Sequence, residues 1–134
     1  MNQKKKYRDL IKSLNIEDVF KWENKYVPDD EISDYFIAAD VLALPYKSAT
    51  QSGVVQIAYH YNKPVIVTDV GGLSEMVINN KTGNIIESEN PIVLADTIIN
   101  NFNNNNYLFM ESYINEYKDN FSWDKFVKGI ESLI

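Results

Sequence analysis

The sequence predicts an α/β fold in which a Rossmann-like parallel sheet is flanked by helices. Helical and strand patterns alternate along the chain, and two short apolar runs, at residues 40–44 and 63–69, are typical of strands buried on both faces. A proline follows the first run, and a pair of glycines follows the second. Regular alternation of this kind favours parallel strands that are joined by crossover helices. We therefore expect residues 1–134 to form one doubly wound unit.

The sequence pattern of the first 39 residues predicts a helix, a strand and a second helix. Apolar residues recur at helical spacing from Tyr7 to Leu14, and residues 17–24 are rich in β-branched and aromatic side chains, which favours a strand. Pro28 and the three acids after it suit a helix start, because acids interact favourably with the positive end of the helix dipole. The same acids could suggest a hard-cation site, but the dipole explains them more simply.

After the strand at residues 40–44, the rest of the chain predicts two more strands and several helices. A helix is expected over residues 54–61, a buried strand over 63–69 and a last short strand around 84–86. From Pro91 the pattern is helical to the end, with breaks at residues 103–106 and near Asn120. The two final helices are expected over residues of about 104–134.

Composition and charge exclude several classes of chemistry. The chain has 134 residues, no cysteine, one histidine and a formal charge of −6. Disulfides, thiol nucleophiles and cysteine-ligated zinc are therefore excluded, and a single histidine excludes multi-histidine metal sites. His60 lies between two tyrosines, where packing or exposure is favoured over catalysis. The net negative charge disfavours nucleic acid as a partner, because binding to its backbone relies on concentrated Lys and Arg.

The N-terminus contains no apolar run long enough for a secretory signal or a membrane helix. We therefore expect a soluble, cytoplasmic protein. Lys4, Lys5 and Lys6 could touch an anionic membrane surface and make the full-length protein membrane-peripheral. A solvated helix face is the simpler interpretation of these three lysines.

The loop after the strand at residues 40–44 is the most informative candidate site. In open α/β sheets, ligands bind beyond the carboxyl ends of the strands. Thr50 and Ser52 supply hydroxyls there, Gly53 allows close approach of the backbone, and free amides of a helix start favour a phosphate. The alternative is that Ser52 or Thr50 simply caps the helix.

Three stretches together resemble a known family. They are "YFIAADVLALPY", "SATQSGVVQIAYHYNKPVIVTDVGGLSEMVINNKTGNII" and "NFSWDKFVKGIESLI". They look like the carboxyl-terminal, donor-binding domain of GT-B-fold glycosyltransferases, specifically retaining family 4, the glycosyl transferases group 1. The resemblance implies transfer of a hexose, with retention, from a nucleoside diphosphate sugar to a glycan or lipid-linked acceptor. It implies no protein nucleophile, no cofactor and no bound metal.

The resemblance also implies roles for particular residues. The loop and helix start would face the donor sugar and pyrophosphate, chiefly through backbone amides, and Gln56 would lie beside the position that usually contacts the ribose. The candidate donor-binding residues are Thr50, Gln51, Ser52, Gly53, Val54 and Gln56. Tyr26 and Val27 match the region that usually lines the base, and Lys47 is the cation nearest to the loop, where a solvated lysine is the simpler interpretation.

Two departures from the family pattern stand out. The E-x7-E acid pair is absent, because Ala49 and Ile57 stand at the two positions, which we interpret as a subfamily variant. The domain's first strands and the N-terminal acceptor-binding domain are also missing, so we expect a domain truncated on its N-terminal side and inactive alone. The alternative function is a non-catalytic fragment that interacts or self-associates through an unpaired sheet edge.

Overall fold

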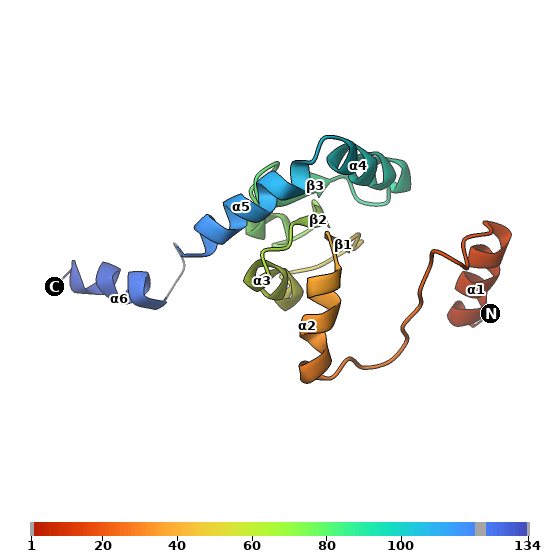
Figure 1. The fold of residues 1–134 in the computed structure, drawn as a ribbon, viewed down its shortest axis with the longest axis horizontal. Helices are drawn as coiled ribbons and strands as arrows, with labels where there is room; N and C mark the ends of the chain where they lie inside the picture. The colour runs from red at the N-terminus through yellow and green to blue at the C-terminus, as the bar shows by residue number, and fades with distance from the viewer. Residues whose placement is uncertain (1, 120–122, 134) are drawn as a thin grey trace.

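The protein contains a parallel sheet of three strands, and the computed structural model describes residues 2–119 and 123–133. The strands are β1 (Leu42–Leu44), β2 (Val65–Thr68) and β3 (Gly83–Ile86). They lie in the order β1-β2-β3, and all pairs are parallel, with Ala43 opposite Ile66 and Ile66 opposite Asn84. Helices surround this sheet in Figure 1. The α/β fold with a parallel sheet and flanking helices is therefore confirmed.

Six α-helices and one short 3₁₀-helix are found among the described residues. They are α1 (Gln3–Ser13), α2 (Asp29–Ala38), α3 (Gly53–His60), η1 (Ser74–Met76), α4 (Pro91–Asn103), α5 (Asn106–Asp119) and α6 (Trp123–Glu131). The predicted break in the asparagine run is present, because α4 ends at Asn103 and Asn105 adopts a left-handed conformation with φ 55°. The predicted break near Asn120 lies outside the described residues.

The core is built around β2, whose four residues are all buried. Val65 and Val67 pack in one cluster with Val55 and Ala58 of α3 and with Ile114 of α5. Alternate residues of a strand point to opposite faces, so α3 and α5 cover the same face of the sheet. This packing fixes α3, and with it the loop that enters α3, relative to the ends of the strands.

A chain of four asparagine side chains links β3 to the helices that follow it. Asn106 donates to Asn101 at 3.1 Å, Asn101 donates to Asn84 at 2.7 Å, and Asn84 donates to Asn80 at 3.0 Å, each through its side-chain amide nitrogen. Asn84 and Asn101 are buried. Because buried amides are costly when unpaired, this chain holds α4, α5 and β3 in one arrangement.

The strand predicted at residues 17–24 is wrong. Residues 17–19 form a turn, and residues 20–24 are extended without belonging to the sheet. The side chains have strand propensity, but a strand also needs a neighbour to bond its backbone groups, and no described residue pairs with this segment. Val19 is 85% exposed as a result.

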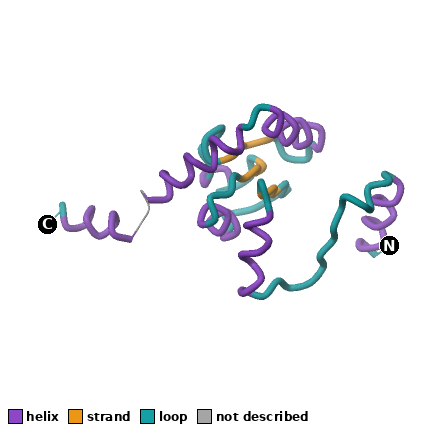
Figure 2. Tube along the Cα trace, viewed as in Figure 1, coloured by secondary structure: helices purple, strands orange, loops and turns teal. Residues whose placement is uncertain are grey.

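The segment from residue 20 to residue 28 runs as a long extended connection between α1 and α2 (Figure 1). Figure 2 shows the same segment as a continuous loop, with α1 lying apart from the strands at one end of the molecule. None of the described helices combines the length and the apolar character that crossing a membrane would require.

Candidate functional site

The loop between β1 and α3 ends in a capped helix start. α3 begins at Gly53, one residue before the predicted start, and the Ser52 hydroxyl accepts a hydrogen bond from the Val54 amide at 3.3 Å. The cap interpretation of Ser52 is therefore confirmed, and its side chain is buried. The hydrogen bond to Ser52 uses the Val54 amide, one of the amides of the first helical turn. A ligand at this helix start would meet the other free amides and the positive end of the dipole.

A glycine turn after β2 packs directly against this loop. Gly71 has φ +50°, a conformation that residues with a Cβ rarely adopt. A Cβ atom on Gly71 would lie 1.7 Å from the Ala49 carbonyl oxygen, and one on Gly72 would lie 2.3 Å from the Thr50 carbonyl oxygen. The loops that follow β1 and β2 are thus in backbone contact, which only glycine permits. The sequence showed the glycine pair after this strand but did not indicate this contact.

Beside the loop, a pocket of about 310 Å³ opens where all three strands end. It is lined by Pro45, Lys47, Thr68, Ile86, Glu87, Glu89, Asn90, Pro91 and Leu94. The Thr68 hydroxyl donates to the Tyr46 carbonyl oxygen at 2.6 Å and so ties the end of β2 to the start of the loop. The Lys47 ammonium lies 3.2 Å from a Glu89 carboxylate oxygen and its side chain is 81% exposed. An anionic ligand would have to compete with Glu89 for this cation.

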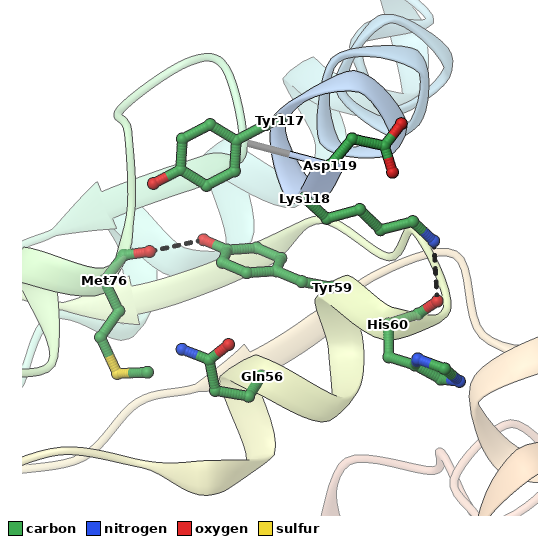
Figure 3. A pocket seen from close by; sticks show the side chains of 7 residues that line it. All are labelled: Gln56, Tyr59, His60, Met76, Tyr117, Lys118 and Asp119. Atoms are coloured by element: carbon green, nitrogen blue, oxygen red, sulfur yellow. Dashed lines mark hydrogen bonds between the residues drawn. The ribbon is translucent and has the colours of Figure 1, made fainter. Parts of the chain in front are cut away.

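A larger pocket of about 580 Å³ lies beside α3, between α3, η1 and the end of α5 (Figure 3). Its lining residues are Gln56, Tyr59, His60, Met76, Tyr117, Lys118 and Asp119. Gln56 is the one predicted donor contact among them. The Lys118 ammonium donates to the His60 carbonyl oxygen at 3.1 Å, so it binds the end of α3 (Figure 3). No sequence pattern indicated that Tyr117 and Lys118 would line a pocket with Gln56.

Tyr59 lines the larger pocket, where its phenol has a structural role and does not act as a general acid or base. Its hydroxyl bonds to the Met76 carbonyl oxygen at 2.8 Å and to the Thr82 hydroxyl at 2.9 Å. A carbonyl can only accept, so Tyr59 donates to Met76 and accepts from Thr82. Burial raises the pKa of Tyr59 to about 12, partly opposed by the Thr82 hydrogen bond. The phenol therefore stays protonated and joins α3 to the η1 turn.

The structure brings the predicted site residues together only in part. Thr50 to Val54 form one continuous loop and helix start, and Gln56 follows one turn later on α3. Tyr26 is 82% exposed on the extended segment before α2, and neither Tyr26 nor Val27 lines the two pockets beside α3 and the strand ends. Their assignment to a nucleotide base stays a prediction.

The site contains polar groups for binding but few for acid–base chemistry. Hydroxyls, backbone amides and one side-chain amide can hydrogen-bond an anion or a sugar. Among residues 2–119 and 123–133, no group of three or more histidine or acidic side chains is placed to hold a metal ion.

Solved structures show the class of fold. The chain matches a sucrose-phosphate synthase from Thermosynechococcus elongatus with a TM-score of 0.78 and 20% identity, over 98% of this chain and 33% of that one. It matches Anabaena HepE, determined in complex with UDP, with a TM-score of 0.76 and 17% identity, over 96% of this chain and 36% of that one. Both are GT-B glycosyltransferases, so the chain has the α/β, Rossmann-like fold of that class.

The chain belongs to the family "Glycosyl transferases group 1", whose profile matches residues 1–121. A relative, an uncharacterized glycosyltransferase of Methanocaldococcus jannaschii, is 31% identical over 105 residues, which cover 78% of this chain and 30% of the relative. The chain therefore spans about a third of the length of each of these three proteins. The family and fold inferred from the sequence are confirmed.

Proposed function

We propose that this chain is the donor-binding half of a retaining glycosyltransferase that takes a hexose from a nucleoside diphosphate sugar. The observation that carries the proposal is the backbone contact between the Gly71–Gly72 turn and the loop at Ala49 and Thr50. It places the amides at the start of α3 in a fixed position beyond the carboxyl ends of β1 and β2. Membership of the group 1 family and the UDP complex of a structural neighbour support the same reading.

The proposed chemistry needs electrostatic stabilisation and no protein nucleophile. The departing diphosphate would receive hydrogen bonds from the amides around Gly53, and the helix dipole would favour its charge. Thr50 and Gln51 offer hydroxyl and amide groups to the sugar, and Gln56 offers a neutral amide toward the nucleotide. The leaving phosphate would assist deprotonation of the acceptor on the same face of the sugar, which gives retention. A loop without acids suits this role.

The chain would not turn over substrate alone. The acceptor, a glycan or lipid-linked molecule, would bind to the rest of a longer protein that closes over the donor. Gln56 lines one pocket and Lys47 lines another. A donor that contacts both residues would therefore have to extend beyond a single pocket. The alternative, a non-catalytic module that self-associates through an open sheet edge, is not favoured by relatives that are glycosyltransferases.

The test is calorimetric titration of UDP, GDP and their sugars onto the full-length protein. We expect one nucleotide to bind, and we expect Thr50→Val with Gln51→Leu to weaken that binding about tenfold. Leu108→Gln is a matched control, because Leu108 is an exposed residue on α5 outside the two pockets. Failure of all four ligands to bind a correctly folded protein would overturn the proposal.

A further inference from the structure

We propose that α1 and the residues that fold back on it form a docking surface for an anionic membrane. Five of the chain's 13 cations and one of its 19 acids lie in α1, so this helix carries a charge of +4 while the remaining residues carry −10. Such asymmetry indicates an anionic partner for one part of the chain. The inference goes beyond the proposed transfer reaction and does not depend on it.

The cations of α1 are free to meet such a partner. Lys4, Lys5, Lys6, Arg8 and Lys12 are all exposed, and none of them joins an ion pair with another described residue. Asp9 within the helix and Glu17, which lines a groove beside it, are two acids near these five cations, so α1 keeps an excess of positive charge. At physiological ionic strength, charges this exposed act over roughly 8 Å. A partner must therefore bring its anions close to α1, as a membrane surface with anionic headgroups does.

Aromatic and apolar side chains accompany these cations. Trp22 folds back onto α1, with its ring 5.9 Å from the Tyr7 ring centroid and the Arg8 guanidinium 5.9 Å from the Trp22 ring centroid. Lys4, Arg8 and Lys12, spaced one turn apart, line a groove of about 260 Å³ together with Phe20, Trp22 and one acid, Glu17. Cations beside a partly exposed tryptophan suit the headgroup level of a bilayer.

An apolar stripe runs along the same helix. Tyr7, Leu10 and Leu14 recur at helical spacing, and each is more than half exposed. A polyanion such as nucleic acid would use the cations but would gain nothing from leucines. A bilayer with anionic headgroups uses both, because the cations meet the headgroups while the apolar side chains enter the acyl boundary. The combination therefore favours a membrane over a soluble polyanion.

The experiment is co-sedimentation of the full chain with vesicles of phosphatidylcholine alone or with added phosphatidylserine. We expect binding only to the anionic vesicles and loss of binding at high salt. The variant Lys4→Gln/Lys5→Gln/Lys6→Gln should bind about a hundredfold more weakly, since each cation near an anionic surface contributes about fivefold. Gln keeps the helix propensity of Lys, so α1 is preserved.

The matched control is Lys25→Gln/Lys47→Gln/Lys81→Gln, which removes the same charge from exposed positions outside α1. It should bind anionic vesicles as the unchanged protein does. With Trp123→Phe, Trp22 is the only tryptophan left, and its emission should shift to the blue when the vesicles are added. Equal loss of binding in both triple variants, or no binding to anionic vesicles, would overturn the proposal. Binding to RNA or salt-sensitive self-association without vesicle binding would do the same.

Discussion

Replacing Gly71 by alanine should displace the loop that precedes α3. The substitution forces a Cβ residue into φ +50°, which costs about 1–2 kcal/mol. The new Cβ would lie 1.7 Å from the Ala49 carbonyl oxygen, and real Cβ atoms essentially never come closer than 3.0 Å to a neighbour. The loop or the turn must therefore move by more than about 1 Å, which can cost roughly a hundredfold in function when a positioned group moves with it.

The assay compares nucleotide affinity, by calorimetry, with thermal stability for the full-length protein. Gly83→Ala is the matched control, because its Cβ would lie 2.0 Å from the Val65 carbonyl oxygen inside the sheet and away from the loop. We expect both variants to lose about 2–4 kcal/mol of unfolding free energy. Only Gly71→Ala should also lose nucleotide affinity, by at least about tenfold. Gly129→Ala lies in helix α6 and meets no atom within 4 Å, so it should leave the affinity unchanged and should not lower the stability, because alanine favours a helix interior over glycine.

The reasoning is refuted if Gly71→Ala and Gly83→Ala lose stability equally and both keep the affinity of the unchanged protein. That result would mean that the glycine turn supports the fold without placing the loop. If the unchanged protein bound no nucleotide, the proposed function would fail instead. Amide hydrogen exchange would still test the contact itself, because exchange in residues 46–52 should rise in Gly71→Ala and not in Gly83→Ala.

Three further predictions concern the core and the reaction. Tyr59→Phe should lower the unfolding free energy, measured by chemical denaturation, by about 1–3 kcal/mol, because the Met76 carbonyl oxygen and the Thr82 hydroxyl lose this partner. An unchanged denaturation midpoint would contradict these hydrogen bonds. The pKa of Tyr59 is raised from 10.0 to about 12 in the folded state, so the folded protein holds this proton more tightly than the unfolded chain. Its contribution, about 2–3 kcal/mol, should be fully present below pH 10 and should be lost as the pH rises toward 12, and denaturant titrations should show a smaller decline over that range in Tyr59→Phe. Transfer activity of the full-length protein should be unchanged by EDTA, and strict dependence on a divalent ion would contradict the proposed metal-free chemistry.

The sequence predicted the order of elements well where local pattern and burial agree. The apolar runs that became β1 and β2 were correctly identified, because a strand buried on both faces has a continuous apolar pattern that differs from its flanking loops. The start of α3 was predicted to within one residue, and Ser52, a strong N-cap residue, precedes it. The segment at residues 17–24 was wrong because strand propensity says nothing about whether a neighbouring strand is present.

The candidate site was less predictable, because its geometry depends on contacts between segments that are distant in sequence. The loop could be located from the rule that ligands bind at the carboxyl ends of parallel strands. Its contact with Gly71 could not, because the pairing of two loop backbones leaves no periodic signal. In the same way, nothing in the local sequence around Lys47 indicates its ion pair with Glu89, which lies 42 positions later.

The four linked asparagines have a direction. Every amide in the series points its nitrogen toward the next oxygen, from Asn106 through Asn101 and Asn84 to Asn80. Turning any inner amide by half a rotation would set nitrogen against nitrogen on one side and oxygen against oxygen on the other. The four amides must therefore take their orientations together, and the linked series discriminates the correct docking of α4 and α5 from packings that would bury the same apolar surface.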